Sequence, residues 1–341
     1  MDNIQKFTTD IGGREATFEF GRYAQQASGS CTVRIGDTVV LATAVMSETI
    51  REGIDYFPLM VDYEERLYAA GKINGSRFIK REGRPTDEAI LTARLVDRSI
   101  RPLFDDTTRQ DVQVVLTVLS VDQENDPDVL SLLAASAALS VSPIPCAGPI
   151  AAVRVGRING EWVLNPSYEA REKCDLETVV AGSEEKVIML EANASQVNEQ
   201  DMYDAITFGH KHLGKLTSFI KGLQEKEGQP KQVPQLGEPD DEEIKALAAV
   251  RAKVEQFCAG KFENIFGKGK KEQALALTKL KDDLEEQLKA DNEVSKELRA
   301  KGLDIVDELY EDAARQLVLA QEKRVDGRAL DQVRQLESEV G

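Results

Sequence analysis

Apolar segments with strand-like patterns recur through the first two thirds of the chain. Two of them meet at Gly36-Asp37, a turn signal that predicts a β-hairpin. The second, residues 38–45, is apolar along nearly its whole length, which predicts a central strand of a sheet. Another buried strand is expected at residues 112–119. Further strand pairs are expected around the turn signals Gly12-Gly13, Asn159-Gly160 and Gly182-Ser183.

Helix signals separate these strands. Thr86 is the expected N-cap of the first helix, because Asp87 and Glu88 suit the positive end of the helix dipole, and Pro102 stops it. The expected helices run from Thr86 to Arg101, from Asp126-Pro127-Asp128 to the residue before Pro143, and from Asn198 or Ser195 towards Gly222. Strand pairs that alternate with helices predict an α/β domain with a mixed sheet over residues 1–225.

The pattern changes after residue 225. Glycine and proline without apolar periodicity predict a linker over residues 226–240. Beyond it, three amphipathic stripes predict a small all-α domain over residues 241–322. The stripes lie at residues 244–257, 277–288 and 298–317.

The end of the chain resembles its beginning. Gly327-Arg328, followed by a Glu-apolar-Gly segment at residues 339–341, repeats the arrangement of Gly13-Arg14 and residues 19–21. Internal similarity of this kind indicates a tandem repeat. We therefore interpret residues 323–341 as the start of a second, truncated α/β domain that opens with a strand.

The composition argues against several classes of protein. The chain has 60 acidic against 43 basic residues and a formal net charge of −17, which argues against non-specific coating of nucleic acid. No apolar run approaches the roughly 20 residues of a membrane span, and the start resembles neither a signal nor a transit peptide. The four cysteines form no close pair, so neither a zinc cluster nor a disulfide framework is indicated. A reducing cytoplasm is the expected location.

One segment departs from this acidic background. Between Lys72 and Arg101, eight basic residues stand against four acidic ones, and a local positive field of this kind predicts an anion site. The loop places Phe78 among Lys80, Arg81 and Arg84. An aromatic ring beside groups that neutralise phosphate is the combination that single-stranded nucleic acid needs.

The helix after this loop carries arginines on one face. Arg94, Arg98 and Arg101 are spaced i, i+4, i+7 and share that face, while apolar positions such as Val96 and Ile100 face inward. The face either binds an anion or is a solvated surface in which Asp97 and Glu88 are the partners.

Other candidate chemistry is weak. The chain contains neither a P-loop nor a GxGxxG motif. His210 and His212 point apart on a helix and cannot share a metal ion. The acidic group Asp122, Glu124, Asp126 and Asp128 precedes a helix start, where carboxylates stabilise the dipole without chemistry. Asp175 and Glu177 share a strand face, but two carboxylates alone are a weak magnesium signal. The residues alone indicate an anion-binding α/β protein with a helical appendage.

Several motifs resemble one family, the bacterial polynucleotide phosphorylases (polyribonucleotide nucleotidyltransferases). They cover essentially the whole chain and weaken mainly in the helical segment. They are Phe78-Ile79-Lys80-Arg81-Glu82-Gly83-Arg84-Pro85, residues 94–104, Asn125-Asp126-Pro127-Asp128-Val129-Leu130, Phe208-Gly209-His210 and residues 324–341.

The resemblance implies a first RNase PH-like domain, an all-helical domain and the start of a second RNase PH-like domain. It implies a ring-shaped homotrimer that degrades single-stranded RNA 3′→5′ by phosphorolysis in messenger RNA turnover, with inorganic phosphate as co-substrate and Mg²⁺ assisting. Nucleoside diphosphates are the product, and partners in an RNA-degradation complex are a further expectation.

The resemblance also implies which site residues lie in this chain and which lie in the second domain. The family's Phe-Phe-Arg-Arg loop stands here as Phe78-Ile79-Lys80-Arg81, where Ile79 replaces one ring and weakens stacking. Asp175 matches one of two metal-binding aspartates of the active copy, and the other has no counterpart. A serine-rich phosphate loop is missing before Asp126. Catalytic and metal-binding residues are therefore expected in the second domain and not in this chain. The alternative is a non-catalytic RNA-binding or structural module.

Overall fold

The computed structural model describes residues 4–50, 54, 56–73, 83–233, 241–291, 294–335 and 337–340, with residues 241–244 in backbone only. The chain forms two compact units, residues 1–237 and 238–341, and each is described by itself. Among the described residues, no helix is both long and apolar enough to cross a membrane.

The first unit is built on a mixed six-stranded sheet in the order β1-β2-β3-β4-β6-β5. All neighbours are antiparallel except β5 and β6, which are parallel. The predicted hairpin at Gly36-Asp37 joins β3 to β4, and β4 lies inside the sheet as its apolar run predicts. The strands are β1 (Gln5–Ile11), β2 (Arg14–Phe20), β3 (Gly29–Ile35), β4 (Thr38–Ile50), β5 (Leu59–Glu64) and β6 (Gln110–Ser120).

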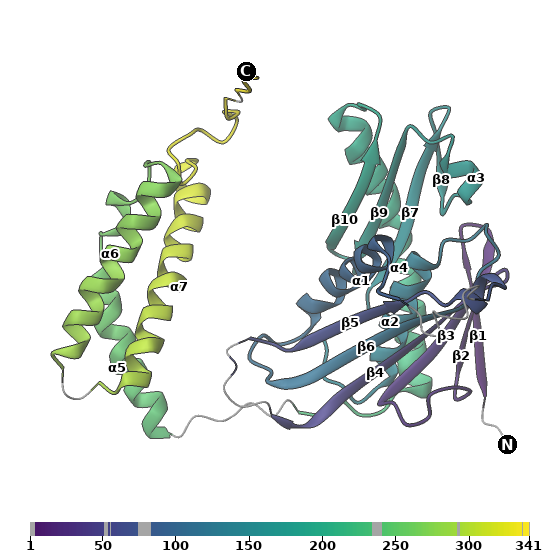
Figure 1. Cartoon of the computed structure of the whole chain (residues 1–341), viewed down its shortest axis with the longest axis horizontal. Helices are drawn as coiled ribbons and strands as arrows, with labels where there is room; N and C mark the ends of the chain where they lie inside the picture. The colour runs from purple at the N-terminus through teal and green to yellow at the C-terminus, as the bar shows by residue number, and fades with distance from the viewer. Residues whose placement is uncertain are drawn as a thin grey trace. The chain divides into compact units, whose positions relative to one another are not determined.

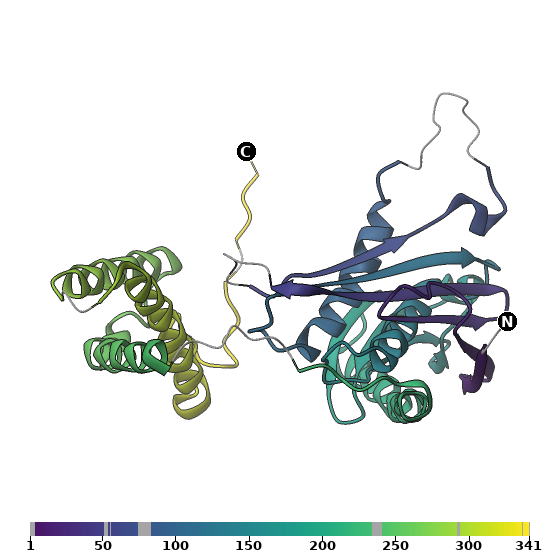
Figure 2. The same ribbon diagram turned by 90° about the horizontal axis from the view of Figure 1, so that it is seen from below.

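One face of this sheet is covered by α2 (Pro127–Val141), in which every residue is buried. The helix reads Leu, Ala and Ser throughout because it has no solvent face to supply with charges. Gly29 of β3 permits the close approach, since a side chain there would collide with the carbonyl oxygen of Ala138. Figure 2 shows helices of the first unit on one face of the sheet. The helix α4 (Glu199–Glu227) packs beside α2 and also reaches the sheet, where the ring centres of Phe219 and Phe18 are 5.2 Å apart.

A second, four-stranded antiparallel sheet has the order β10-β9-β7-β8. Its strands are β7 (Ala151–Ile158), β8 (Glu161–Leu164), β9 (Leu176–Gly182) and β10 (Val187–Ala194). The long helix α4 packs on β7 and β9, and Gly209 fits between Val155 and Val180. The short α3 (Tyr168–Arg171) connects β8 to β9 (Figure 1).

The helix α1 (Asp87–Ile100) packs on β5 and reaches β10. Thr86 is its N-cap, as predicted, and accepts a hydrogen bond from the amide of Ala89 at 3.0 Å. The inward positions of α1 include Ala89, Val96 and Ile100, which are buried. The strand β5 was not predicted, because its segment mixes Asp62 and Glu64 with apolar residues and only its parallel partner β6 gives it a defined face.

The second unit contains three long helices, α5 (Asp241–Cys258), α6 (Lys270–Lys289) and α7 (Lys296–Gln321). The predicted stripes form its core, which includes Val254, Leu284 and Val306. Ile244 of the first stripe lies outside the residues whose side chains are described. Gly302 of α7 lets the helix approach Leu288 closely.

The C-terminal segment is held to this unit by a turn at residues 324–327. The carbonyl oxygen of Val325 accepts hydrogen bonds from the Gly267 amide at 2.9 Å and from Gln273 at 2.9 Å. The strand predicted at the end of the chain is absent from the described part of residues 330–340. A strand needs a partner for its hydrogen bonds, and this segment has none among the described residues.

Candidate functional site

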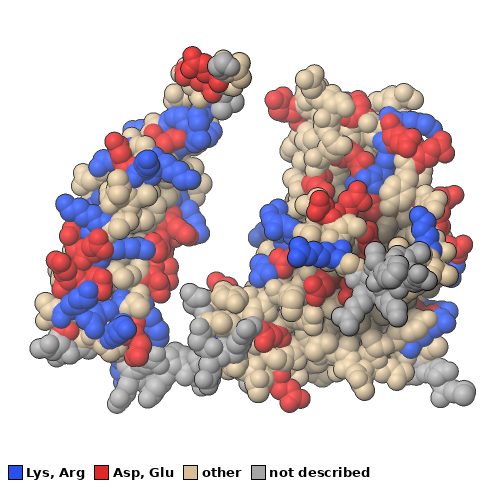
Figure 3. Space-filling model, viewed as in Figure 1, with Lys and Arg blue, Asp and Glu red and all other residues tan. Residues whose placement is uncertain are grey.

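The arginine face of α1 divides into two parts. Arg94 and Arg98 are exposed and form no ion pair with any residue that the structure describes. Arg101 is occupied: it binds Asp97 at 2.6 Å and donates to the carbonyl oxygens of Phe57 and Leu59. Figure 3 shows Lys and Arg side chains gathered over the region of α1. Of the three arginines of this face, Arg94 and Arg98 therefore have guanidinium groups available to an external anion.

The loop residues Phe78, Lys80 and Arg81 lie outside the described residues. Arg84, the fourth candidate of that loop, is described and exposed, and it precedes Pro85 and the N-cap of α1. Lys72 stands on the other side of the loop and is also exposed. Neither Lys72 nor Arg84 has an ion-pair partner within the described chain.

Lys72 and Arg84 both line a cavity of about 930 Å³ in the first unit. Its wall includes the carboxylates of Glu64 and Glu65 and the ring of Tyr168. Glu64 is paired with Arg66, another wall residue, and Glu65 accepts a hydrogen bond from Thr86 at 2.9 Å. The described part of the wall thus includes two cations without ion-pair partners, two carboxylates and two tyrosines, Tyr63 and Tyr168. A smaller cavity beside α1 is lined by Arg94.

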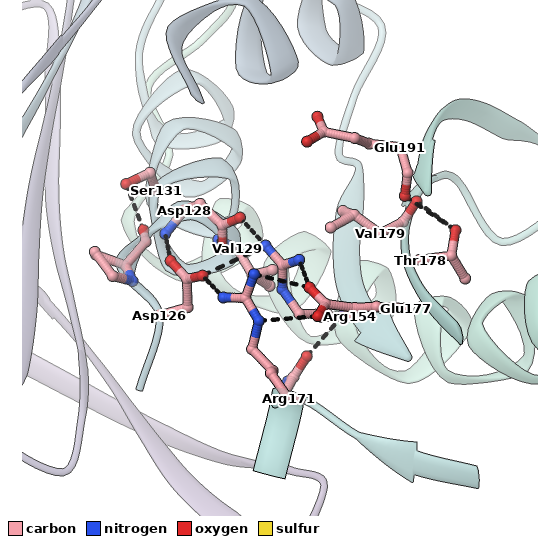
Figure 4. A network of polar contacts seen from close by, with 12 residues as sticks. Asp126, Asp128, Val129, Ser131, Arg154, Arg171, Glu177, Thr178, Val179 and Glu191 are labelled. Carbon is pink, nitrogen blue, oxygen red and sulfur yellow. Dashed lines mark hydrogen bonds and ion pairs between the residues drawn. The ribbon is translucent and has the colours of Figure 1, made fainter. Parts of the chain in front are cut away.

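A cluster of charged side chains lies under this cavity, where α2 begins (Figure 4). Arg154 of β7 is 8 % exposed and binds Asp128 of α2 and Glu177. Arg171 of α3 binds Asp126 and, at 2.8 Å, Glu177. We call these five residues the ionic cluster. Two guanidinium groups face three carboxylates, so each guanidinium has carboxylate partners inside the protein and the cluster has one more acidic than basic group.

Burial controls proton binding in the ionic cluster. Burial of Asp128, with the neighbouring charge of Asp126, raises the pKa of Asp128 from 3.8 to about 7, although Arg154 acts in the opposite direction. For Arg154, burial would lower the pKa, but the carboxylates of Asp128, Asp126 and Glu177 hold it above the ordinary value. The guanidinium therefore stays charged, and Asp128 holds a proton more tightly than an ordinary aspartate does.

Tyr168 connects the ionic cluster to the cavity. The guanidinium carbon of Arg171 lies 5.4 Å from the centre of the Tyr168 ring, a cation–π distance. Burial and the charges of Asp126 and Asp128 raise the pKa of the Tyr168 hydroxyl. The ring is 41 % exposed. A residue of the cavity wall is thus fixed from beneath by the buried charges.

The acidic group before α2 is structural. Asp126 is the N-cap of α2 and accepts a hydrogen bond from the Asp128 amide at 3.1 Å. Asp122 accepts from the amide of Asp37 and the hydroxyl of Thr38, which anchors the β3–β4 turn. Burial alone would raise the pKa of Asp122, but the amides of Asn125 and Glu124 hold it well below its usual value. Asp126 therefore caps α2, as the position before a helix predicts, and Asp122 anchors the turn. Both Asp126 and Asp128 also belong to the ionic cluster.

Asp175 and Glu177 have separate partners. Asp175 forms a two-pronged pair with Arg157, at 2.9 and 2.6 Å, and this lowers the pKa of Asp175. Glu177 belongs to the ionic cluster. No group of three or more potential metal ligands occurs within the described residues. Because guanidinium groups already occupy these carboxylates, the residues present do not fit Mg²⁺.

The histidines are not brought together. His212 packs against the ring of Phe208, with the ring centres 4.9 Å apart, and His210 is half-buried on the same helix. The spacing i, i+2 on α4 separates their side chains as predicted.

Sequence reasoning did not identify Arg154, Arg171, Tyr168 or Lys72 as parts of one region. One signal was present: Arg154 interrupts the apolar run of β7, and an arginine in a buried strand requires a carboxylate partner. The partners themselves come from α2, α3 and β9, and no sequence spacing relates these elements.

Comparison with known proteins assigns the chain to a family. Residues 12–145 match domain 1 of the 3′ exoribonuclease family, and residues 148–212 match domain 2 of the same family. The chain belongs to the 3′ exoribonuclease family. Its first unit is an RNase PH-like domain with a mixed sheet, as predicted, and a helical region follows.

Individual relatives agree with this assignment. The polyribonucleotide nucleotidyltransferase of Heliobacterium modesticaldum is 44 % identical over 340 residues, which cover 99 % of this chain and 46 % of that protein. The enzyme of the same name from Bacillus cytotoxicus is 43 % identical over 339 residues, covering 99 % of this chain and 46 % of that protein. The chain thus spans about half the length of the curated relatives it matches.

Two solved structures are similar at lower levels. The crystal structure of rice (Oryza sativa) Rrp46 aligns with a TM-score of 0.47 and 16 % identity over 66 % of this chain and 94 % of that one. The Archaeoglobus fulgidus exosome with RNA bound to the active site aligns with a TM-score of 0.48 and 19 % identity, over 66 % and 88 %. The family assignment rests on the sequence matches.

Proposed function

We propose that this chain is part of a polyribonucleotide nucleotidyltransferase that degrades single-stranded RNA from its 3′ end, with inorganic phosphate as the attacking group. The products are nucleoside diphosphates, and the process is messenger RNA turnover in the cytoplasm. The observation that carries the proposal is the 44 % identity to such an enzyme along 99 % of the chain. In the longer protein the active form is a homotrimer, with partners from an RNA-degradation complex.

Within this protein the chain guides RNA. The basic segment supplies Lys80, Arg81 and Arg84 from the loop and Arg94 and Arg98 from α1. Their cations neutralise phosphates of the strand, and Phe78 offers a ring for one base. Arg101 contributes less, because its guanidinium is bound to Asp97 and two carbonyl oxygens.

The chemical step belongs to another domain of the longer protein. Phosphorolysis needs groups that neutralise both the attacking phosphate and the RNA phosphate, and a magnesium ion supplies part of this charge. In this chain the carboxylates near the start of α2 are bound by Arg154 and Arg171, which favours a guiding and scaffolding role. Mg²⁺ and inorganic phosphate are therefore assigned to the second RNase PH-like domain.

Release of nucleoside diphosphate from poly(A) tests the proposal. The longer protein should release it only when inorganic phosphate is present, whereas residues 1–341 alone should release none. Phosphate-independent hydrolysis by the longer protein would contradict the proposed reaction. Phosphate-dependent release by residues 1–341 would contradict the assignment of the chemistry to another domain.

A binding titration tests the guiding role against that of a purely structural module. Lys80→Ala together with Arg81→Ala should weaken binding of single-stranded RNA. The double substitution should also reduce the slope of log affinity against log salt by about 1.4, because each neutralised phosphate of a single strand contributes about 0.7. Unchanged affinity and an unchanged slope would favour the structural module.

A further inference from the structure

A cavity of about 930 Å³ has no role in the proposed function. It lies wholly in the first unit, between β5, the N-terminal end of α1 and α3. Ligand cavities in proteins commonly measure about 300–1,000 Å³. The volume therefore suits a ligand of the size of a nucleotide.

Its wall carries three kinds of group that match the three parts of a nucleotide. Tyr168 presents a partly exposed ring, on which a base can stack. Lys72 and Arg84 are cations without ion-pair partners among the described residues, and they suit a phosphate. Glu65 is a carboxylate that can accept hydrogen bonds from ribose hydroxyls.

The Tyr168 ring is fixed in advance. The guanidinium carbon of Arg171 lies 5.4 Å from its ring centre. Arg171 is itself held by Asp126 and Glu177. A ring that is already ordered costs little entropy when a base stacks on it. The ionic cluster thus acts as the support of a binding surface, in addition to holding α2 and β7 together.

The cavity is also next to the basic loop in the chain. Lys72 precedes the loop, residues 83–85 follow it, and both flanks line the cavity.

We propose that the cavity binds one nucleotide, with its base on Tyr168, its phosphate at Lys72 and Arg84 and its ribose at Glu65. The proposal rests on the proposed function for the class of ligand. The nucleotide is either the terminal residue of an RNA strand or a free mononucleotide. The site differs from the phosphorolytic centre, which is assigned to another domain.

Calorimetric titration of residues 1–341 with AMP, adenosine and inorganic phosphate tests the proposal. AMP should bind more tightly than either fragment, because it uses both the ring and the cations. Tyr168→Ala should weaken AMP binding about tenfold, in the range measured for loss of one stacked base. Tyr168→Phe keeps the ring and should retain most of the affinity. Lys72→Ala with Arg84→Ala should weaken AMP binding and leave adenosine binding unchanged.

Tyr203→Ala is the matched control, because Tyr203 is 64 % exposed on α4 and is not part of the cavity wall. Competition with oligo(A) distinguishes the two sources of the nucleotide, the end of an RNA strand and a free mononucleotide. Displacement of AMP identifies an RNA end as the occupant, and its absence identifies a free nucleotide. Both results support a nucleotide site.

The proposal is overturned if AMP binds no more tightly than phosphate, or if folded Tyr168→Ala binds AMP like the wild type. Circular dichroism establishes that the variants are folded. Failure here leaves phosphorolysis by the longer protein untouched. Conversely, AMP binding together with absence of phosphorolysis would contradict the proposed function and leave the site in place.

Discussion

Arginines of the first unit occupy two contrasting environments. Arg94 and Arg98 on α1 are exposed and have no ion-pair partner among the described residues. Arg154 and Arg171 at the start of α2 are bound to three carboxylates, and Arg154 is almost fully buried. Arginine is thus available to an external ligand on α1, whereas at the start of α2 it stabilises the fold.

Desolvation decides which of these two roles an arginine has. A buried guanidinium without a partner would cost several kcal/mol, so the fold supplies carboxylates for it. An exposed guanidinium keeps its water and needs no partner, so its charge remains available to an incoming phosphate. Three predictions test this contrast, in order of decreasing effect on stability.

Arg154→Met should have the largest effect. Removing the guanidinium leaves Asp128 buried without its ion-pair partner and leaves Glu177 with Arg171 alone. Breaking a buried pair in this way costs about 3–5 kcal/mol. Chemical denaturation of residues 1–341 would measure the loss in free energy of unfolding. Arg94→Met is the matched control and should change it by less than about 0.5 kcal/mol. Equal losses of unfolding free energy in the two variants would contradict the distinction between buried and exposed arginines.

Asp128→Asn should change how stability depends on pH. The folded protein holds the Asp128 proton up to about pH 7, whereas the unfolded chain releases it near the ordinary value of 3.8. Between these values the folded state binds more protons, so through this group stability falls as the pH rises from about 4 to 7. The variant lacks this contribution.

Urea denaturation at several pH values measures the effect. The free energy of unfolding of the wild type should fall relative to that of Asp128→Asn up to about pH 7 and stay parallel above it. Asp204→Asn, an exposed carboxylate on α4, is the control. Parallel curves for wild type and Asp128→Asn over the whole range would show that the pKa of Asp128 is the same in the folded and unfolded states.

Arg94→Ala with Arg98→Ala should leave stability nearly unchanged and affect only ligand binding. If both groups contact phosphates of single-stranded RNA, the salt slope of binding should fall by about 1.4. Lys245→Ala with Lys279→Ala removes two exposed cations from the helical unit and serves as the control. An equal change in both double variants would mean that net charge, and not the α1 face, governs binding.

Local patterns were sufficient for most elements of the fold. The Gly36-Asp37 hairpin, the central β4, the caps of α1 and α4 and the three helical stripes of the second unit follow from neighbouring residues in the chain. The family motifs added the RNase PH-like character of the first unit. The strand β5 was missed, because its position is defined by pairing with β6, which lies about 50 residues further along.

The candidate site shows the same division between features set by local sequence and features set by contacts in space. By itself the sequence determined where positive charge is concentrated, since residues 72–101 are adjacent in the chain, and it determined that α1 presents arginines on one face. Only the tertiary structure decided which of them are free, because Arg101 finds its partners on α1 and before and within β5.

Only the tertiary structure, likewise, brought Arg154, Arg171 and Tyr168 to the start of α2. The physical reason is that burial and charge compensation depend on distances in space between separate elements. Helix periodicity and turn chemistry, in contrast, depend on a few consecutive residues.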